Sequence, residues 1–359
     1  MGHAMSPPVH ASYVAIGPEA GQHATNSMTD PCSAYFERPM GFYSEDLRQR
    51  FIDSSARIAG VGGGGLTLAV MLAKEGVNDF SIADPDTIDA TNVGRIPMLT
   101  PSDIGQLKVD VTARLILEHN PTATVRVYKD GVNTVNVDEF IGYDAGNRGI
   151  TVGFDEIEMT EPQIALIFYR AARRAGRYVV NATDVDRGGL ATTFAPDRRH
   201  YTFERYNGAR ASHTEAEFVA RVNGFSLPSI PNIPTNGTRS TLHAVMHDAP
   251  LPTTLRSVLV ATALAMDEFE KLLTLDLPHY SRPHIYPRFH AVNPSRGEDF
   301  VTRFPRMRSL SRIARLAVRD VLGLNPATSY SETDRKQREE HRAEITEDSN
   351  SRAFAGANE

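Results

Sequence analysis

Polar and charged residues follow a glycine-rich stretch between Arg57 and Lys108, in an order that suits chemistry on a phosphate group. When a carboxylate attacks the α-phosphate of a nucleotide, two anions approach each other, so the site needs cations and hydrogen-bond donors. Arg95 and Lys108 supply positive charge, and Asn92 can donate without adding charge. Asp84 can accept a hydrogen bond from a ribose hydroxyl. This set of residues favours a site that binds a nucleotide and neutralises charge at its phosphates.

The glycine-rich turn itself is typical of a phosphate-binding loop between a strand and a helix. A short apolar strand is predicted to end at Ala59, and a helical apolar pattern runs from Leu66 to Lys74. The backbone between them must bend tightly and approach an anion closely, and the amides at the helix N-terminus then face that anion. The next predicted strand, 80–83, ends directly before Asp84. The glycines of the turn are Gly60, Gly62, Gly63 and Gly65.

Taken together, these motifs resemble the ThiF/MoeB/HesA family of adenylating enzymes, which are related to ubiquitin activators. The resemblance is strongest in this stretch and continues more faintly from about Arg38 to about Leu273. It implies that the chain binds ATP with Mg²⁺ through its glycines, Asp84 and Asp86, and that Asn92, Arg95 and Lys108 act in catalysis. The matching segments are Gly60-Val61-Gly62-Gly63-Gly64-Gly65, Asp84 with Asp86, Thr91-Asn92-Val93-Gly94-Arg95 and Gly105-Gln106-Leu107-Lys108.

Two acidic positions compete for the magnesium ion, which takes oxygen ligands. Asp155 follows a predicted strand at 149–154, whereas Asp184 follows the next predicted strand, at 178–183. The resembling family places its metal aspartate after the strand that precedes an arginine-rich helix, here 162–175. The resemblance therefore favours Asp155, and Asp184 remains the alternative.

The resemblance also implies a homodimer in which an N-terminal arginine reaches the partner subunit's nucleotide site. Arg38 is the best match, although its spacing to the glycine loop differs from the family pattern. An ordinary surface arginine is the alternative interpretation. Arg38 is therefore predicted as a further catalytic residue, supplied across the dimer.

Strand and helix patterns alternate along the chain and predict an α/β fold. We expect a Rossmann-like, mostly parallel sheet flanked by helices, with an antiparallel extension and a C-terminal elaboration. The extension is predicted from strands at 191–194 and 201–205, and the arginines of helix 162–175 are predicted to form a solvated face. The expected organisation is a disordered tail at 1–33, an adenylation domain at 34–275, an elaboration at 276–328 with a helix at 310–322, and a disordered charged tail at 329–359.

Composition excludes several classes of protein. The chain has 359 residues and a net charge of −6, so nothing indicates a basic protein built around nucleic acid. No apolar run reaches membrane-spanning length, and the N-terminus lacks the apolar core of a signal peptide, so a cytoplasmic location is predicted. The single cysteine, Cys32, excludes an intramolecular disulfide and cysteine-rich zinc sites.

The sequence therefore predicts an ATP-dependent adenylyltransferase that activates a carboxylate and releases pyrophosphate. The resemblance implies a substrate that is a peptide, a small ubiquitin-like or sulfur-carrier protein, or a small acid. The resemblance also implies that a mobile loop at 225–238, which precedes a helix at 255–273, crosses the site. Because this loop holds no cysteine, the acyl-adenylate is predicted to react with a separate nucleophile. Alternatives are an NAD-dependent oxidoreductase, in which Asn92, Arg95 and Lys108 have no role, and a non-catalytic scaffold.

Overall fold

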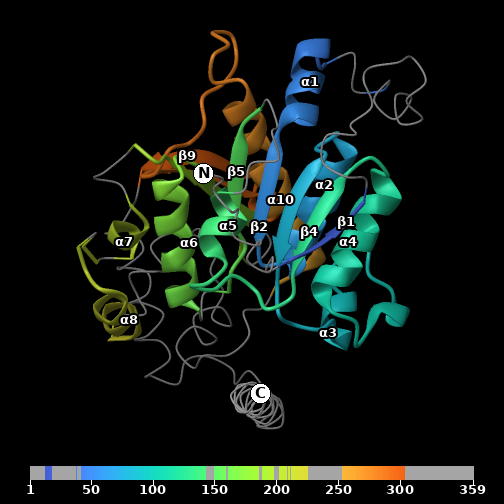
Figure 1. Ribbon diagram of the computed structural model, residues 1–359. Helices are drawn as coiled ribbons and strands as arrows, with labels where there is room; N and C mark the ends of the chain where they lie inside the picture. Colours follow the sequence, from blue (N-terminus) through green and yellow to red (C-terminus); the bar gives the residue numbers. More distant parts are fainter. Residues whose placement is uncertain are drawn as a thin grey trace, which may run out of the picture.

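A nine-stranded sheet with the order β1-β4-β3-β2-β5-β6-β7-β8-β9 forms the centre of the molecule (Figure 1). The computed structural model describes residues 13–17, 38, 42–142, 149–158, 161–185, 188–197, 202–207, 209–210, 212–224 and 253–303. Strands β4, β3, β2, β5 and β6 run parallel, and β1, β7, β8 and β9 pair antiparallel. The predicted α/β fold with an antiparallel extension is therefore confirmed. The strands are β1 (Val14–Ile16), β2 (Ser55–Ala59), β3 (Asp79–Ala83), β4 (Thr124–Tyr128), β5 (Thr151–Asp155), β6 (Tyr178–Val185), β7 (Gly188–Phe194), β8 (Arg288–Asn293) and β9 (Glu298–Arg303).

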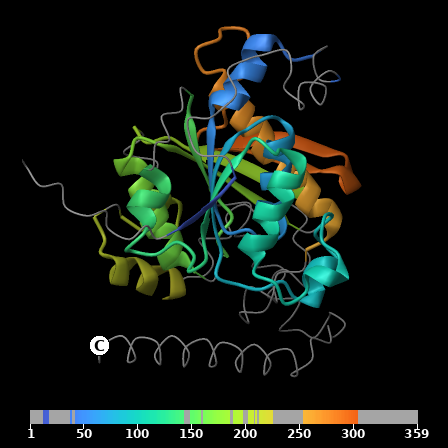
Figure 2. The same ribbon diagram turned by 45° about the vertical axis from the view of Figure 1, so that its right-hand side comes forward.

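Helices cover both faces of the sheet (Figure 2). Apolar residues of α2, α4 and α10 pack on one face, and those of α5 and α6 pack on the other. None of the helices in the described ranges is long and apolar enough to cross a membrane. The helices are α1 (Glu45–Asp53), α2 (Gly63–Lys74), α3 (Ala90–Val93), α4 (Lys108–His119), α5 (Val137–Gly142), α6 (Pro162–Arg174), α7 (Phe203–Tyr206), α8 (Glu215–Gly224) and α10 (Leu255–Leu273).

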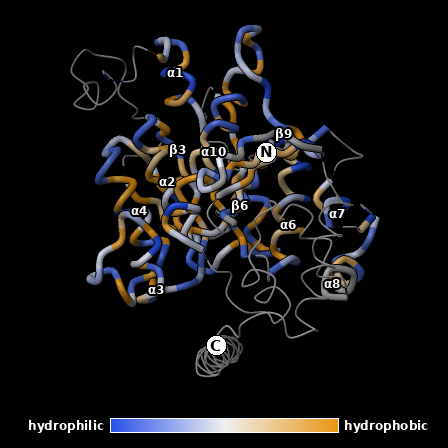
Figure 3. The backbone as a smooth tube through the Cα atoms, turned by 180° about the vertical axis from the view of Figure 1, so that it is seen from behind, coloured by the Kyte–Doolittle hydropathy of each residue, from blue (hydrophilic) through white to orange (hydrophobic). Residues whose placement is uncertain are grey.

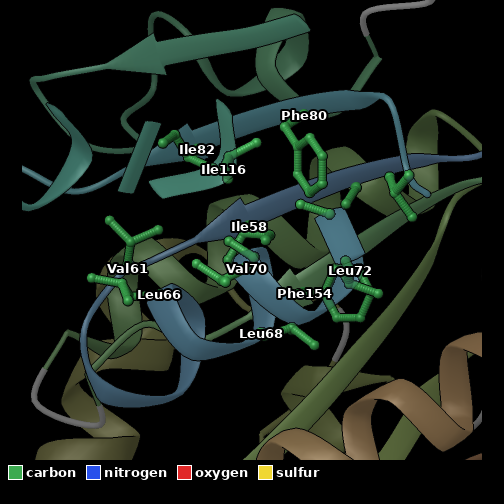
Figure 4. Packing of buried hydrophobic residues seen from close by; sticks show 14 of the residues in the cluster. Ile58, Val61, Leu66, Leu68, Val70, Leu72, Phe80, Ile82, Ile116 and Phe154 are labelled. Atoms are coloured by element: carbon green, nitrogen blue, oxygen red, sulfur yellow. The ribbon is translucent and has the colours of Figure 1, made fainter. Parts of the chain in front are cut away.

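The central strands are buried on both faces, as is usual for a parallel sheet between two helical layers. In one buried cluster, Ile58 of β2 lies beside Val70 of α2, and Phe154 of β5 lies beside Leu72 of the same helix (Figure 4). The hydrophobic segments in Figure 3 accordingly lie mainly where helices and strands meet. This packing holds α2 against the sheet, with its N-terminus at the end of β2.

The sheet reverses its winding direction between β2 and β5. From β2 the chain moves to β3 and β4 on one side, and then returns to β5 and β6 on the other side. In open α/β sheets, ligands bind in the crevice beyond the carboxyl ends of the strands at such a switch point. The glycine-rich turn follows β2 and therefore lies at this position.

Two local predictions were wrong. A strand, β1, forms within the predicted disordered tail and pairs with the edge of β4. Residues 203–206 form helix α7 rather than a strand, because the hydroxyl of Thr202 caps its first turn by accepting from the amide of Arg205. The predicted mobile loop at 225–238, the predicted helix at 310–322, Cys32 and the C-terminal tail at 329–359 lie outside the described residues.

The predicted solvated face of α6 also needs correction. Arg170 and Arg173 both donate to the carboxylate of Glu204, which is fully buried under them. Burial alone would raise the pKa of Glu204, but the bonds from Arg173 and Arg170 outweigh it and lower that pKa. These arginines therefore join α6 to α7 instead of facing only solvent.

A charged cluster is buried beneath the α5–α6 face of the parallel strands. Arg57 of β2 and Arg126 of β4 both donate to the carboxylate of Asp79 at the start of β3. All three side chains are almost completely shielded from solvent. The two guanidinium groups hold the pKa of Asp79 below its ordinary value even though burial acts in the opposite direction. The cluster ties three neighbouring strands together.

We expect Asp79→Asn to destabilise the fold strongly. The substitution leaves two buried guanidinium groups without their counter-charge, and breaking a buried ion pair in this way typically costs about 3–5 kcal/mol. Urea unfolding followed by circular dichroism measures the effect. Asp138→Asn is the matched control, since Asp138 pairs with Arg174 on the exposed surface and such pairs contribute about 0–1 kcal/mol. Equal losses in the two variants would contradict a structural role for the buried cluster.

Candidate nucleotide site

The backbone of the glycine turn packs directly against the segment that follows β5. Gly60 has a φ of +90°, and its amide donates to the carbonyl of Ala83 over 2.8 Å. A Cβ on Gly60 would overlap the backbone carbonyl of Glu156, and a Cβ on Gly65 would overlap the carbonyl of Gly60. No larger residue fits at either position without moving the backbone.

The turn presents the N-terminus of α2 to the crevice. Gly62 is the N-cap, and no side chain caps the first amides. These amides carry the positive end of the helix dipole, which favours an anion. A Cβ on Gly62 would meet nothing within 4 Å, whereas one on Gly63 would lie 3.3 Å from the Val258 side chain. Gly62 thus borders open space, while Gly63 is covered by α10.

Asp84 anchors the turn to the end of β3. One of its carboxylate oxygens accepts from the amide of Val61 and the other accepts from the amide of Asp86, each over 2.9 Å. Lys108, the first residue of α4, places its Nζ 2.7 Å from Asp86 and 3.6 Å from Asp84. Burial would lower the pKa of Lys108, but the two carboxylates outweigh it and raise the pKa, so the amine stays charged. The predicted trio of Asp84, Asp86 and Lys108 is thus brought together.

Arg95 lies at the opposite side of the turn. Its Nη1 donates to the hydroxyl of Thr253 over 3.2 Å and lies 3.5 Å from the position of a Cβ on Gly63. Arg95 and Thr253 also act on Asp184 at the end of β6, where they oppose the increase in pKa that burial causes. The structure therefore groups Arg95 with Asp184 beside the N-terminus of α2.

Asn92 and Arg38 belong neither to the group around Lys108 nor to the group around Arg95. Asn92 is buried in α3, where its backbone amide donates to the Asp89 carboxylate and its side-chain oxygen accepts from the Asp89 amide, which together form a capping box. Its backbone carbonyl accepts from the amide of Arg95, so Asn92 holds the turn that carries Arg95. Arg38 is exposed, and no hydrogen bond or ion pair joins it to the site within the described ranges.

Asp155 faces away from Asp184. Its carboxylate accepts from the amide of Ile157 and from Nδ2 of Asn181, on the face covered by α6. Burial raises its pKa to about 6, and hydrogen bonding from Tyr169, Ile157 and Asn181 offsets this only in part. Asp184 comes three residues after Asn181 on β6, and successive side chains alternate between the two faces of a strand. The two competing aspartates therefore lie on opposite faces of the sheet.

Glu156 was not singled out by the sequence reasoning, yet it lies in the crevice. One of its carboxylate oxygens lies against the Cα of Gly64, so that a Cβ there would overlap it. Burial raises its pKa well above the ordinary value, and the charges of Asp184 and Asp155 raise it further. The signal available in the sequence was its position directly after Asp155, since the side chain of the next residue faces the other way.

A divalent cation fits this arrangement only in part. No group of three or more His, Cys, Asp or Glu side chains in the described ranges is arranged to hold a metal ion by itself. Mg²⁺, however, is usually bound by one or two carboxylates together with water and substrate phosphates. Glu156 and Asp184 provide carboxylates that repel each other at the edge of the anion site. The pair is therefore suited to a metal ion that arrives with a nucleotide.

Comparison with known proteins identifies the family of this chain. The sequence pattern of the ThiF family matches residues 36–306. The tRNA threonylcarbamoyladenosine dehydratase of Escherichia coli K12 is 31% identical over 127 residues, which cover 35% of this chain and 46% of that protein. A probable molybdopterin-synthase adenylyltransferase of Porphyra purpurea is 34% identical over 119 residues, 31% of each chain. The matched region thus spans less than half the length of these curated relatives.

Solved structures show the same fold at low sequence identity. A structure of E. coli MccB with AMPCPP and MccA has a TM-score of 0.54 at 17% identity and covers 76% of this chain and 72% of that chain. A structure of E. coli MccB with ATP has a TM-score of 0.51, also at 17% identity, and covers 73% and 67% of the two chains. At this identity the likeness establishes a common fold and nothing finer.

We expect Gly65→Ala to disturb the turn and Gly62→Ala to leave it intact. The first methyl group collides with a backbone carbonyl, and such overpacking typically costs about 1–3 kcal/mol. The second points into open space, so a change of about 0.5 kcal/mol or less is expected. Thermal unfolding compares their stabilities, and only Gly65→Ala is expected to lower the unfolding temperature clearly. Identical behaviour of the two variants would be inconsistent with the close backbone approach.

Proposed function

Because the chain belongs to the ThiF family, we propose that it uses ATP to convert a carboxylate into an acyl-adenylate and releases pyrophosphate. The observation that carries the proposal is that Arg95 borders Gly63 at the start of α2, while Lys108 pairs with Asp84, which holds the other side of the same turn at the switch point of the sheet. The free amides at the N-terminus of α2 would donate hydrogen bonds to phosphate oxygens. An NAD-dependent oxidoreductase would leave Arg95 and its neighbour Asp184 without a role, and this alternative is not favoured.

In this proposal each cation acts on a different part of the crevice. Arg95 borders Gly63, so it would neutralise charge that develops where the carboxylate attacks. Lys108 lies with Asp84 and Asp86 on the other side, where it would turn from Asp86 toward the departing phosphates. Asp84, already bonded to the turn, would accept from a ribose hydroxyl. Asn92 would act indirectly, by holding the turn that presents Arg95.

Mg²⁺ would be held by Glu156 and Asp184 rather than by Asp155. A metal ion held there would offset the negative charge of the phosphates. Glu156 borders Gly64, and Asp184 neighbours Arg95, so both face the proposed phosphate site. Asp155 instead bonds Asn181 on the α6 face. Its role would be to fix the end of β5, which positions Glu156.

The acyl group is proposed to belong to a peptide or a small ubiquitin-like protein. Similar structures include MccB with MccA, and the relatives include a ubiquitin-like modifier-activating enzyme 5 of Drosophila grimshawi that is 32% identical over 106 residues, or 29% of this chain and 26% of that protein. Since Cys32 is the single cysteine, the acyl-adenylate would pass to a nucleophile outside this chain. A homodimer with Arg38 acting across the interface remains part of the proposal.

We expect Lys108→Ala to lower ATP–pyrophosphate exchange by about 10²–10³-fold, because the loss of one transition-state donor typically has this effect. Exchange is measured with labelled pyrophosphate and a library of peptides that end in a free carboxylate. Lys129→Ala is the matched control, since Lys129 pairs with Asp110 on the surface. Exchange at wild-type level in Lys108→Ala, with an intact fold, would remove Lys108 from the catalytic set.

The metal assignment is tested by comparing Glu156→Gln with Asp155→Asn. We expect Glu156→Gln to raise the Mg²⁺ concentration needed for half-maximal exchange by at least about 10-fold, because a proposed ligand loses its charge. Asp155→Asn should need close to the wild-type concentration, and both variants should still bind AMP. If Asp155→Asn shows the larger metal defect, the original prediction from the sequence is correct and the proposed pair is wrong.

A further inference from the structure

A neutral hydroxyl holds the side chain of Arg95. Its Nη1 donates to Thr253 over 3.2 Å, and within the described residues this is the one hydrogen bond that the Arg95 side chain makes. The charge of Arg95 also acts on the carboxylates of Asp89 and Asp184, but no ion pair joins it to either in the ranges that the structure describes. A guanidinium carries several N–H donors in a rigid fork, so one bond fixes its plane and leaves the other donors for a ligand.

The neutrality of this acceptor suits an anion site. A carboxylate in the place of Thr253 would fix Arg95 equally well, but it would also cancel the positive charge that attracts phosphate oxygens. A hydroxyl accepts a hydrogen bond and leaves the net charge unchanged. Its own proton can still be donated, and Thr253 acts on the carboxylate of Asp184 at the end of β6. Thr253 therefore connects Arg95 to Asp184 without neutralising either group.

The backbone that carries Thr253 is fixed by the start of α10. The next residue, Thr254, is the N-cap of that helix, and its hydroxyl accepts from the amide of Ser257 over 3.1 Å. Val258, in the same turn, would lie 3.3 Å from a Cβ on Gly63 at the start of α2. The two helices pack against each other (Figure 1). The first turn of α10 thus holds Thr253 beside the helix end at which the anion site lies.

Two carboxylates would compete for Arg95 if the hydroxyl were absent. Asp89 caps the first turn of α3, and Asp184 lies near the end of β6. The long side chain of arginine can turn toward either of them, because opposite charges attract strongly away from bulk water. Such a turn would carry the guanidinium away from Gly63. A shift of about 1 Å at a reacting group can cost about 10²-fold in rate.

We propose that Thr253 is a positioning residue that keeps Arg95 directed at the start of α2. This inference rests on the proposed adenylation, in which Arg95 stabilises the charge that develops as the carboxylate attacks. The hydroxyl of Thr253 would fix the guanidinium beside Gly63 before the nucleotide binds, so that no reorientation is needed during the reaction. Thr253 itself exchanges no atom with the substrate.

The first test compares Thr253→Val with Thr253→Ser in ATP–pyrophosphate exchange. Valine has nearly the same shape but no acceptor, so kcat/KM for ATP is expected to fall about 10- to 100-fold. Serine keeps the hydroxyl and should restore kcat/KM to within about 3-fold of the wild-type value. Thr274→Val is the matched control and should exchange normally, since the Thr274 hydroxyl bonds the carbonyl of Glu270 at the other end of α10. Normal exchange in Thr253→Val, or no recovery with serine, would overturn the proposal.

The second test determines whether Thr253 acts through Arg95. In a double-mutant cycle, Thr253→Val should add less than about 2-fold to the loss that Arg95→Ala causes alone, because the hydroxyl then has no guanidinium to hold. Losses that add fully would mean that Thr253 acts by another route, and the proposal would be wrong.

Calorimetric titration with ATP and Mg²⁺ separates this inference from the proposed reaction, because it requires no carboxylate substrate. Thr253→Val and Arg95→Ala should each weaken ATP binding at least about 3-fold, again without adding. Thr253→Asp should bind ATP at least about 10-fold more weakly than Thr253→Asn, which has the same size but no charge. A wild type that binds ATP with this pattern and exchanges no pyrophosphate would refute the reaction and support the positioning role. Equal binding by all variants, or no binding by the wild type, would overturn the positioning role.

Discussion

The close backbone approach between the glycine turn and the segment after β5 is the constraint from which the rest of the site follows. Because β2 and β5 are neighbours at the switch point, the turns beyond both strands share one space. Glycine at 60 and at 65 lets those backbones touch. The contact fixes the start of α2 and, at the same time, brings Glu156 against it. A single steric requirement thereby places an anion-attracting helix end next to an acidic side chain.

The C-terminal part of the described chain packs against the glycine turn and Arg95. Helix α10 covers Gly63 with Val258 and is preceded by Thr253, which bonds Arg95. Farther along α10, the fully buried Glu268 accepts from the hydroxyl of Thr193 on β7 and from the backbone amide of His284. The antiparallel strands therefore anchor the helix that forms one wall of the crevice. The extension of the sheet contributes to the site although it supplies none of the proposed phosphate contacts.

The sequence was most informative where residue type and spacing act locally. The glycines, Asp84 and Lys108 were predicted together, and the structure groups them, because a turn between a strand and a helix is specified by a few consecutive residues. Which carboxylate at the end of β5 enters the crevice was harder to predict. Asp155 and Glu156 are adjacent, and the pleat of β5 directs their side chains to opposite faces. A one-residue ambiguity at a strand end therefore changes which carboxylate enters the crevice.

Other parts could not be predicted because they depend on partners that are distant in the sequence. Strand β1 spans only Val14–Ile16, and it forms because β4 offers a free edge. The arginines of α6 look like a solvated face in the sequence, and only the position of Glu204 on α7 shows that they cover a buried charge. Whether a polar group is buried depends on the tertiary structure, because the sequence shows the group but not the residue that pairs with it.

The balance of charge around the turn adds a constraint on what the crevice can accept. Arg95 and Lys108 face a larger number of carboxylates, and burial raises the pKa of Asp84, Glu156 and Asp184. A free triphosphate would add negative charge to a region that already resists ionisation of its own acids. A triphosphate that brings a divalent cation instead supplies the counter-charge that Glu156 lacks. Under the proposed function, the acidic excess thus discriminates in favour of the metal-bound nucleotide, while the helix end and the two cations bind its phosphates.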